Sequence, residues 1–189
     1  MALTAVALCS RALLMVGAAS IASFDEGTAE SEVAANLFPS VRDALLSLHP
    51  WNFATRQATL ARLVAAPVAD HANAFQLPDD CLRVLSAGGD GRGRGLSYAV
   101  IGRQLHCDAD GVTLSFIARV PEADFPAFFD QTLIARLAAE FCLPLTESTS
   151  RADFLRKVAE EELKRARATD AQEDAPRAIE DFTLVEVRR

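Results

Sequence analysis

The chain has 189 residues, half of them hydrophobic and 24% charged, which allows one domain or one domain with an insertion. Its net charge of −7 argues against tight, non-specific binding to nucleic acid, because such binding needs many Lys and Arg contacts to phosphates. A mean hydropathy of +0.13 is high for a free monomer and favours burial of some apolar surface against other subunits.

The four cysteines show no spacing that suits a metal site or a redox motif. None lies in a C-x-x-C pair, and no zinc pattern is present. We expect buried free thiols in a reducing compartment at Cys9, Cys81, Cys107 and Cys142. The sequence predicts no metal and no cofactor.

The first twenty residues are apolar but resemble neither a signal peptide nor a membrane span. A basic segment before the apolar run is missing, and Arg11 interrupts that run. Thr4 is a suitable cap for a helix over residues 5–16, and Gly17 is a natural stop. We therefore predict a buried helix and no membrane partner.

A second helix is expected between Thr28 and Pro50. Its helical spacing predicts a core face made of Val33, Leu37, Val41, Leu45 and Leu48. Pro39 falls inside this run, so it must either kink the helix or split it, with a new start at Ser40.

The middle of the chain reads as short strands joined by turns. We expect strands beginning at Phe53 and over residues 75–77, 81–86, 96–101, 104–107 and 112–120. Residues 87–95 contain five glycines and predict a flexible loop. The short connections at 102–103 and 108–111 predict an antiparallel meander.

The helical period returns near Phe125 and continues to Pro144. Residues 148–150 cap a final helix over residues 151–169, with a predicted core stripe of Phe154, Val158 and Leu163. On its outer face we expect ion pairs from Glu160 to Lys164 and from Glu161 to Arg165.

After a polar linker, the end of the chain is again apolar and strand-like. The apolar positions are Ile179, Phe182, Leu184, Val185 and Val187. They could dock on the chain's own sheet, or add to the edge of a partner's sheet. If the segment adds to the edge of a partner's sheet, it is a binding segment for another protein.

Together these elements predict an α+β fold. Residues 1–50 and 122–172 would form a helical bundle, residues 51–121 an inserted antiparallel β domain, and residues 173–189 an extended tail.

Two features could suggest nucleic-acid binding. Arg92 and Arg94 alternate with glycines, but the loop lacks the strand-then-helix context of a phosphate-binding loop, and these arginines could simply be solvated. Trp51 and Phe53 could stack on bases, although a core anchor between helix and sheet suits an acidic chain better.

Catalytic signals are weak. The D-A-D-G run at 108–111 lacks the later ligands of a calcium loop and reads as a turn. Asp79, Asp80 and His106 are candidates for a hydrolase, yet no nucleophile motif or metal motif accompanies them. We therefore predict that the protein is not an enzyme.

Several stretches, in order, resemble the tail tubular protein A family of tailed bacteriophages. They are S-F-D-E-G-T at 23–28, P-S-V-R-D-A-L-L at 39–46 and H-P-W-N-F-A at 49–54, followed by similar stretches at 54–60, 75–84, 101–105, 129–146 and 167–173. The resemblance covers residues 3–174. The glycine-rich loop and the end beyond Asp174 depart most from the family.

This resemblance implies a structural role in the virion. Members are head-to-tail adaptors that form a ring, usually dodecameric, beneath the portal protein, and DNA passes through the lumen without specific binding. The helical bundle would contact the portal, and the β part would face a tail protein. The resemblance thus implies a protein made in the host cytoplasm and placed at the head–tail junction.

For the tail of the chain, the implied partner is the portal, with Ile179, Phe182, Leu184, Val185 and Val187 as the docking residues. Arg92 and Arg94 are then candidates for contact with DNA in the channel. The main rival is a DNA-binding module that uses Arg92, Arg94 and Trp51. A hydrolase at Asp79, Asp80 and His106 is the third hypothesis.

Overall fold

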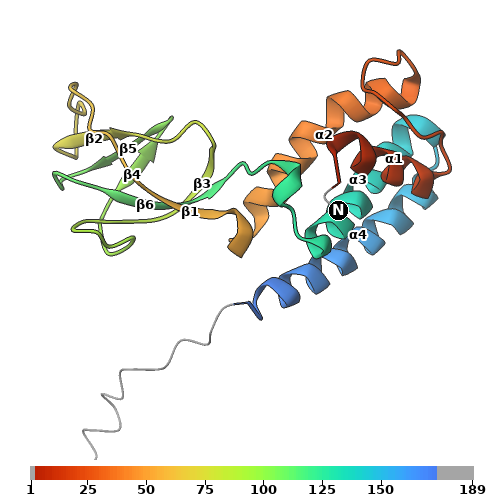
Figure 1. Cartoon of the computed structure of the whole chain (residues 1–189). Helices are drawn as coiled ribbons and strands as arrows, with labels where there is room; N and C mark the ends of the chain where they lie inside the picture. The colour runs from red at the N-terminus through yellow and green to blue at the C-terminus, as the bar shows by residue number, and fades with distance from the viewer. Residues whose placement is uncertain (1–2, 174–189) are drawn as a thin grey trace, which may run out of the picture.

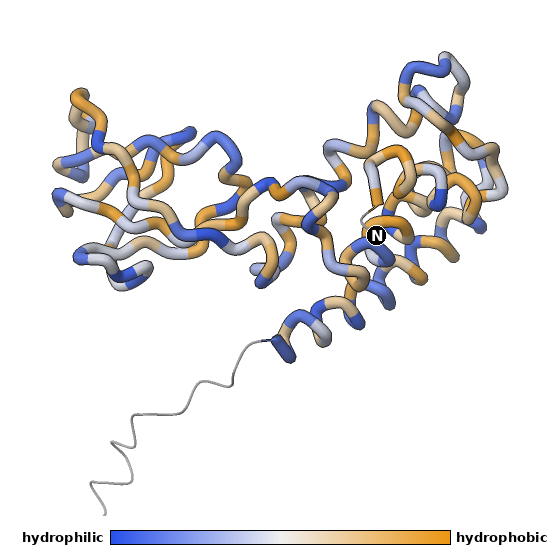
Figure 2. Tube along the Cα trace, viewed as in Figure 1, coloured by the Kyte–Doolittle hydropathy of each residue, from blue (hydrophilic) through white to orange (hydrophobic). Residues whose placement is uncertain are grey.

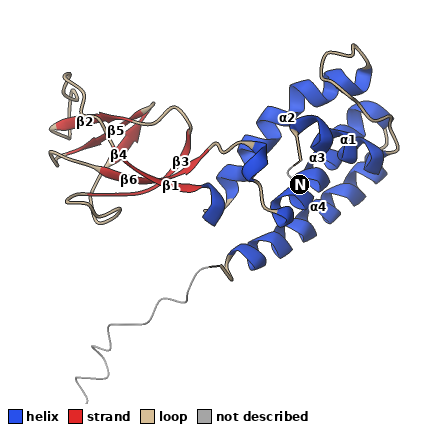
Figure 3. Cartoon of the chain, in the orientation of Figure 1, coloured by secondary structure: helices blue, strands red, loops and turns tan. Residues whose placement is uncertain are grey.

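The computed structural model describes residues 3–173. Over this range the chain forms four α-helices and six short strands, which gather into two regions side by side (Figures 1 and 3). Both ends of the described chain lie among the helices, and the strands come from its middle. The α+β class predicted from the sequence is confirmed. We refer to the four packed helices as the helical bundle and to residues 55–118 as the β region.

The N-terminal helix follows its local signals closely. Helix α1 (Ala5–Val16) begins where the Thr4 side chain accepts a hydrogen bond from the Ala7 N–H, and it ends at Gly17 in the left-handed conformation. Helix α2 (Ala29–Leu48) starts with a capping box, in which Thr28 and Ser31 each accept the other's backbone N–H.

Pro39 does not divide α2, so of the two alternatives, a kink or a split, the split at Ser40 is wrong. The helix continues through Pro39 to Leu48. Pro39 lies on the exposed side of the helix, as does Ala35, the residue whose carbonyl would have accepted the missing N–H bond. Because that carbonyl faces water, the helix can tolerate the proline.

The predicted core stripe of α2 is also largely wrong. Leu45 is buried, but Val33, Leu37 and Val41 are only half-buried and Leu48 is 54% exposed. The buried face is turned to one side and consists of Ser31, Ala34, Phe38, Leu45 and Leu46. Apolar residues therefore occupy two faces of α2, and periodicity alone could not tell which face the bundle covers.

The other two helices form a hairpin of α3 (Ala127–Thr146) and α4 (Thr149–Asp170). The predicted stripe of α4 is wrong at Phe154, which is 64% exposed, while Val158 and Leu163 are half-buried. The buried positions are instead Ala152, Leu155, Ala159, Ala166 and Asp170. Small residues on this face let α4 lie close to α3.

The ion pairs on the outer face of α4 also differ from those predicted. They join Glu161 to Lys164 at 3.3 Å and Glu162 to Arg165 at 2.8 Å, both at a spacing of three residues. Residues three apart and residues four apart are both neighbours on a helix surface, so the sequence could not choose between the two registers.

The strands form two antiparallel sheets of three strands each. In the first, the central strand pairs with two neighbours in the order β1 (Thr55–Thr59), β6 (Thr113–Ala118), β3 (Cys81–Gly88). In the second, the order is β2 (Asn73–Gln76), β5 (Gln104–Cys107), β4 (Ala99–Ile101).

The predicted meander is therefore wrong, although the hairpin of β4 and β5 at Gly102–Arg103 is correct. The loop at 108–111 carries the chain from one sheet to the other. Strand β6 is buried at almost every position because it is central in its sheet. A short apolar run does not show which strands will become its neighbours.

One hydrophobic core runs through both regions, and aromatic side chains lie where they meet. Trp51 is fully buried, its indole N–H donates to the Leu45 carbonyl at 3.1 Å, and its ring lies 5.3 Å from that of Phe129. Phe53, Phe125 and Phe128 complete this aromatic junction. Trp51 is thus the predicted core anchor and cannot offer its ring to bases.

Two polar contacts tie the ends of the β region to the bundle. The Arg119 guanidinium forms a bidentate ion pair with the Asp43 carboxylate. Arg42 pairs with both Asp43, at 2.9 Å, and Glu122, at 2.8 Å. Because Arg119 and Glu122 lie in the connection from β6 to α3, these pairs orient the β region against α2.

At the end of α4, the carboxylate of Asp170 makes the second of these contacts. Asp170 is only 2% exposed, and its Oδ1 accepts the backbone N–H of Asn52 at 3.0 Å. The Asn52 amide donates in turn to the Asp170 carbonyl at 2.8 Å. The end of α4 is therefore fixed where the chain leaves α2 for β1.

Candidate functional site

The glycine-rich segment between β3 and β4 is the most distinctive surface of the β region. It has neither helix nor strand over residues 89–98, so the predicted loop is longer than expected and the predicted strand over 96–101 is wrong at residues 96–98. The segment is nevertheless fastened to the first sheet. The Ser86 hydroxyl donates to the Gly93 carbonyl at 2.7 Å, and the Leu96 N–H donates to the Ala87 carbonyl at 3.0 Å. The segment therefore lies across the sheet face.

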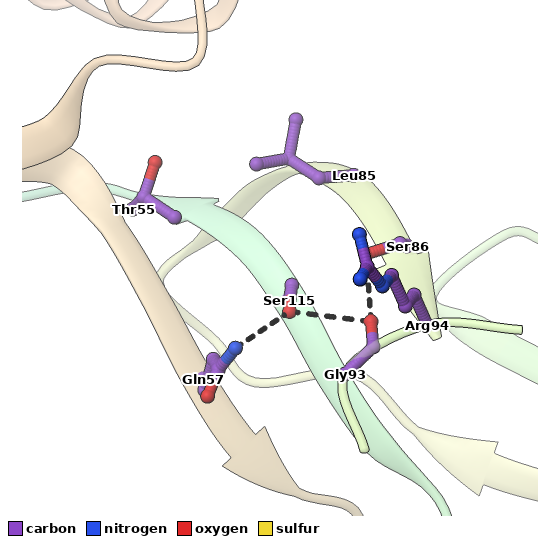
Figure 4. Close-up of a pocket in the computed structure, with 7 residues that line it drawn as sticks. All are labelled: Thr55, Gln57, Leu85, Ser86, Gly93, Arg94 and Ser115. Atoms are coloured by element: carbon purple, nitrogen blue, oxygen red, sulfur yellow. Dashed lines mark hydrogen bonds between the residues drawn. The ribbon is translucent and has the colours of Figure 1, made fainter. Parts of the chain in front are cut away.

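Between this segment and the sheet is a small pocket of about 420 Å³, shown in Figure 4. Neighbouring strands supply its hydroxyl and amide groups. The Gln57 amide donates to the Ser115 hydroxyl at 3.2 Å, and that hydroxyl lies 3.4 Å from the Gly93 carbonyl. We call this the loop pocket, and its lining residues are Thr55, Gln57, Leu85, Ser86, Gly93, Arg94 and Ser115.

Two glycines let the segment approach the sheet so closely. A Cβ at Gly93 would lie 2.6 Å from the Ser115 hydroxyl, and one at Gly88 would lie 2.1 Å from the Arg92 carbonyl. Both distances are far shorter than van der Waals contact. The glycines thus serve close packing of the loop on the sheet, not a turn around a phosphate group.

Arg92 and Arg94, the two predicted DNA-contact residues, are both exposed on this segment. Neither forms an ion pair within residues 3–173. Arg94 lies at the rim of the loop pocket beside neutral hydroxyl groups. A guanidinium with hydroxyl neighbours can hold an anionic oxygen, so the arrangement suits contact with a phosphate better than catalysis.

The hydrolase candidates do not come together. His106 belongs to β5 of the second sheet and contacts Gln104 at 3.2 Å, whereas Asp80 precedes β3 and lies 3.7 Å from Arg56. No hydrogen bond or ion pair among the described residues joins Asp79 or Asp80 to His106. Over the same residues, no group of three or more His, Cys, Asp or Glu side chains could hold a metal ion.

The acidic run at 108–111 connects the two sheets, in agreement with its reading as a turn. Asp108 accepts the Ala72 N–H at 2.9 Å, and Asp110 lies 3.1 Å from the Arg62 guanidinium. Both carboxylates are thus used to hold the neighbouring loop over residues 60–72. Asp110 is nevertheless 94% exposed, which is unlike an enclosed calcium ligand.

The four cysteines are buried and free, as the sequence predicted. Burial raises the pKa of Cys9 to about 12, and burial also raises the pKa values of Cys81 and Cys107. Raised pKa values keep these thiols protonated and unreactive at neutral pH.

Two carboxylates are buried in the core, Asp130 and Asp170, and the sequence analysis did not predict either of them. Asp130 lies in the first turn of α3, and burial raises its pKa although the positive charge of Arg11 opposes the shift. Near Asp170, burial lowers the pKa of His49 and outweighs the attraction of the carboxylate 3.3 Å away. No local motif in the sequence marks either group.

A family model described as Tail tubular protein matches residues 3–178. The chain belongs to the tail tubular protein family. No curated protein matches its sequence. Membership makes this chain a structural component of a bacteriophage tail, and an oligomeric assembly is the form that the family implies.

In this tail tubular protein, the residues predicted to bind the portal lie outside the described range. They are Ile179, Phe182, Leu184, Val185 and Val187. No helix of the described chain has the length and apolar character needed to cross a membrane.

Proposed function

We propose that this protein is a head-to-tail adaptor, which forms a ring beneath the portal, joins the capsid to the tail and surrounds the channel for DNA ejection. The family match over residues 3–178 carries the proposal. The function requires no reaction, metal or cofactor. Its place is the head–tail junction of the virion, after synthesis in the host cytoplasm.

The two-part shape supports this role. The helical bundle and the β region lie side by side, and the aromatic junction with the Asp43–Arg119 pair connects them firmly (Figure 1). An adaptor must bind different partners at its two ends and keep them in register. We assign the helical bundle to the portal side and the β region to the tail side.

Electron cryo-microscopy of the full chain mixed with the portal protein encoded near it is the direct test. We expect a closed ring of twelve copies beneath the portal, with helices at the contact. A chain that forms no complex with the portal at moderate salt would contradict the adaptor role. Family membership would then support only a different structural position in the tail.

The apolar positions after residue 178 are the proposed portal anchor. An alternating apolar segment can add to the edge of a partner's sheet. Deleting residues 175–189 should therefore abolish portal binding, and so should aspartate at both Phe182 and Leu184. Unchanged portal binding after the deletion would exclude this anchor. A melting temperature equal to that of the full chain would show that the deletion leaves the fold intact.

Arg92 and Arg94 are proposed to face DNA in the channel. Their exposure and lack of ion pairs within residues 3–173 favour this contact, and they also support the alternative function of a DNA-binding module. The adaptor proposal predicts weak binding to duplex DNA. Sub-micromolar binding that falls steeply with salt, and that Arg92→Ala with Arg94→Ala removes, would favour the alternative.

A further inference from the structure

Two apolar surfaces that the bundle leaves open lie on different sides of the molecule. On one side, the half-buried residues of α2 border a groove whose floor is α3. One part of this groove, of about 470 Å³, includes Val33, Leu37 and Leu143. A second part, of about 290 Å³, shares Leu37 and continues to Leu48.

This groove follows α2 from Val33 to Leu48, about 22 Å at 1.5 Å per residue. Its apolar side chains remain half-buried or exposed, with Leu143 44% and Leu48 54% exposed. A helix in a small globular protein usually has one apolar face. The second apolar face of α2 therefore calls for a packing partner that the isolated chain does not provide.

On another side of the bundle, exposed apolar side chains gather where the end of α1 lies beside the start of α4. Phe154 is 64% exposed, and Leu14 and Met15, at the end of α1, are 62% and 43% exposed. The Arg151 guanidinium donates to the Val16 carbonyl at 2.8 Å, which places the end of α1 beside the start of α4. We call Leu14, Met15 and Phe154 the knob.

Groove and knob cannot meet within one chain. Arg156 lines the groove, whereas Phe154 is two residues away and so projects from nearly the opposite side of α4. Two complementary patches on different sides of one subunit are the requirement for a head-to-tail interface, which closes into a ring when the rotation fits.

Beside the two patches, the charged side chains that form no ion pair among residues 3–173 are opposite in sign. Arg151 and Lys157 flank Phe154, one turn before it and one turn after it. Glu32 borders the groove, and the other charged residues that line it already form ion pairs within the chain, Arg136 with Glu140 and Arg156 with Asp153. Lys157 and Glu32 are both exposed, and neither forms an ion pair in the part of the chain that the structure describes.

From these observations we infer that the knob of one copy packs into the α2–α3 groove of the next copy, with Lys157 beside Glu32 across the interface. The inference rests on the proposed ring and names the surfaces that build it. It assigns to Phe154 and Leu48 the apolar contacts that the single chain leaves unmade.

The test uses full-length chains whose self-association is measured by sedimentation velocity, alone and with the portal present. Phe154→Asp damages the knob and Leu143→Asp damages the groove, both at exposed positions. Each should weaken self-association by about 30-fold or more, the size expected for an interface hot spot. Val68→Asp, in a fully exposed apolar residue of the β region, is the matched control and should change nothing.

Mixing the two damaged variants gives the sharpest outcome. Each variant keeps one intact patch, so the mixture should form a heterodimer that cannot grow further. The double charge reversal Lys157→Glu with Glu32→Lys should restore the association that either single reversal weakens. Circular dichroism spectra and melting temperatures of the variants should match those of the wild-type chain.

Unchanged assembly of both Phe154→Asp and Leu143→Asp would overturn the inference, as would a mixture in which no heterodimer forms. A wild-type chain that stays monomeric alone and with the portal would overturn it as well. These results are separate from those on the adaptor role, because portal binding is measured directly. A ring built through another surface would leave the adaptor proposal intact.

Discussion

In the helical bundle, the fully buried side chains are mostly large and apolar, and they gather around α3 and the aromatic junction. In the β region, much of the outer shape depends on individual hydrogen bonds, such as those that fasten the glycine-rich segment over Ser86 and Ser115. The hydropathy view shows hydrophobic and hydrophilic residues alternating along both regions (Figure 2), and exposed apolar residues occur in both, such as Val64 and Val68 in the β region and Phe154 in the bundle.

Because of this difference, substitutions in the two regions should change the stability of the protein in different ways. Loss of buried apolar volume weakens a whole cooperative unit, whereas loss of a loop contact acts locally. Since a continuous core connects the regions, damage at the aromatic junction should affect both.

The largest effect is expected from Trp51→Ala. Trp51 is fully buried, and the rings of His49, Phe53, Phe128 and Phe129 all lie within 6.3 Å of its own. Its removal should lower the free energy of unfolding by about 3–5 kcal/mol in urea titrations. Phe154→Ala, in an exposed ring, is the control and should change it by less than about 0.5 kcal/mol. A loss below about 1 kcal/mol for Trp51→Ala would mean that the two regions do not share one core.

Asp170→Ala tests the link between α4 and the start of the β region. It leaves the half-buried Asn52 N–H without its acceptor, so the free energy of unfolding should fall by about 1–3 kcal/mol. Asp170→Asn keeps an oxygen acceptor at this position and should lose less. Equal losses in the two variants would indicate that the negative charge, and not the hydrogen bond, stabilises this contact.

Gly88→Ala should act within the β region alone. The added Cβ would overlap the main chain of Arg92 and Arg94, so the segment over residues 89–96 must move away from the sheet. Overpacking of this kind costs about 1–3 kcal/mol. Hydrogen exchange should accelerate in this segment and not in α3. Gly111→Ala is the matched control, because no atom lies within 4 Å of its added Cβ.

The smallest effect is a pH dependence that begins at Asp130. Burial raises its pKa in the folded protein above the ordinary value of 3.8, so the native state holds this proton more tightly than the unfolded state does. The stability that protonation provides is therefore present at low pH and is lost as pH rises through the folded pKa. Asp130→Asn should remove this loss and make the protein more stable at pH 7.

The positive charge of Arg11 opposes this rise in the pKa of Asp130. Arg11→Gln should therefore steepen the fall in stability with rising pH, and urea titrations between pH 4 and pH 7 would measure both slopes. The same slope in wild type and Asp130→Asn would show that another group controls the pH dependence of the bundle.

Local signals predicted the beginnings and ends of elements well. Helix α1 has the predicted bounds, strand β5 lies where expected, and Thr4, Gly17 and Thr28 act as the predicted caps. Ser148, within the predicted cap segment 148–150, caps α4 two residues earlier than expected. Each of these signals depends on hydrogen bonds within a few residues of the chain. The position of Trp51 in the core was also predictable, because a large apolar ring between helix and strand has little other use.

Predictions that depend on contacts between distant segments of the chain were wrong. Apolar spacing placed Phe154 and Leu48 in the core, yet the bundle covers other faces of α4 and α2. The loop pocket brings together Gln57, Gly93 and Ser115 from three separate segments. Nothing local in those segments marks their meeting.

The sequence by itself determined the α+β class, the helix caps, the buried cysteines and the family, because composition, short-range hydrogen bonding and ordered motifs are properties of the chain alone. Only the tertiary structure decided the strand order, the burial of Asp130 and Asp170, and which apolar faces remain open. Those features depend on which distant segments come together, and periodicity shows that a face is apolar without showing what will cover it.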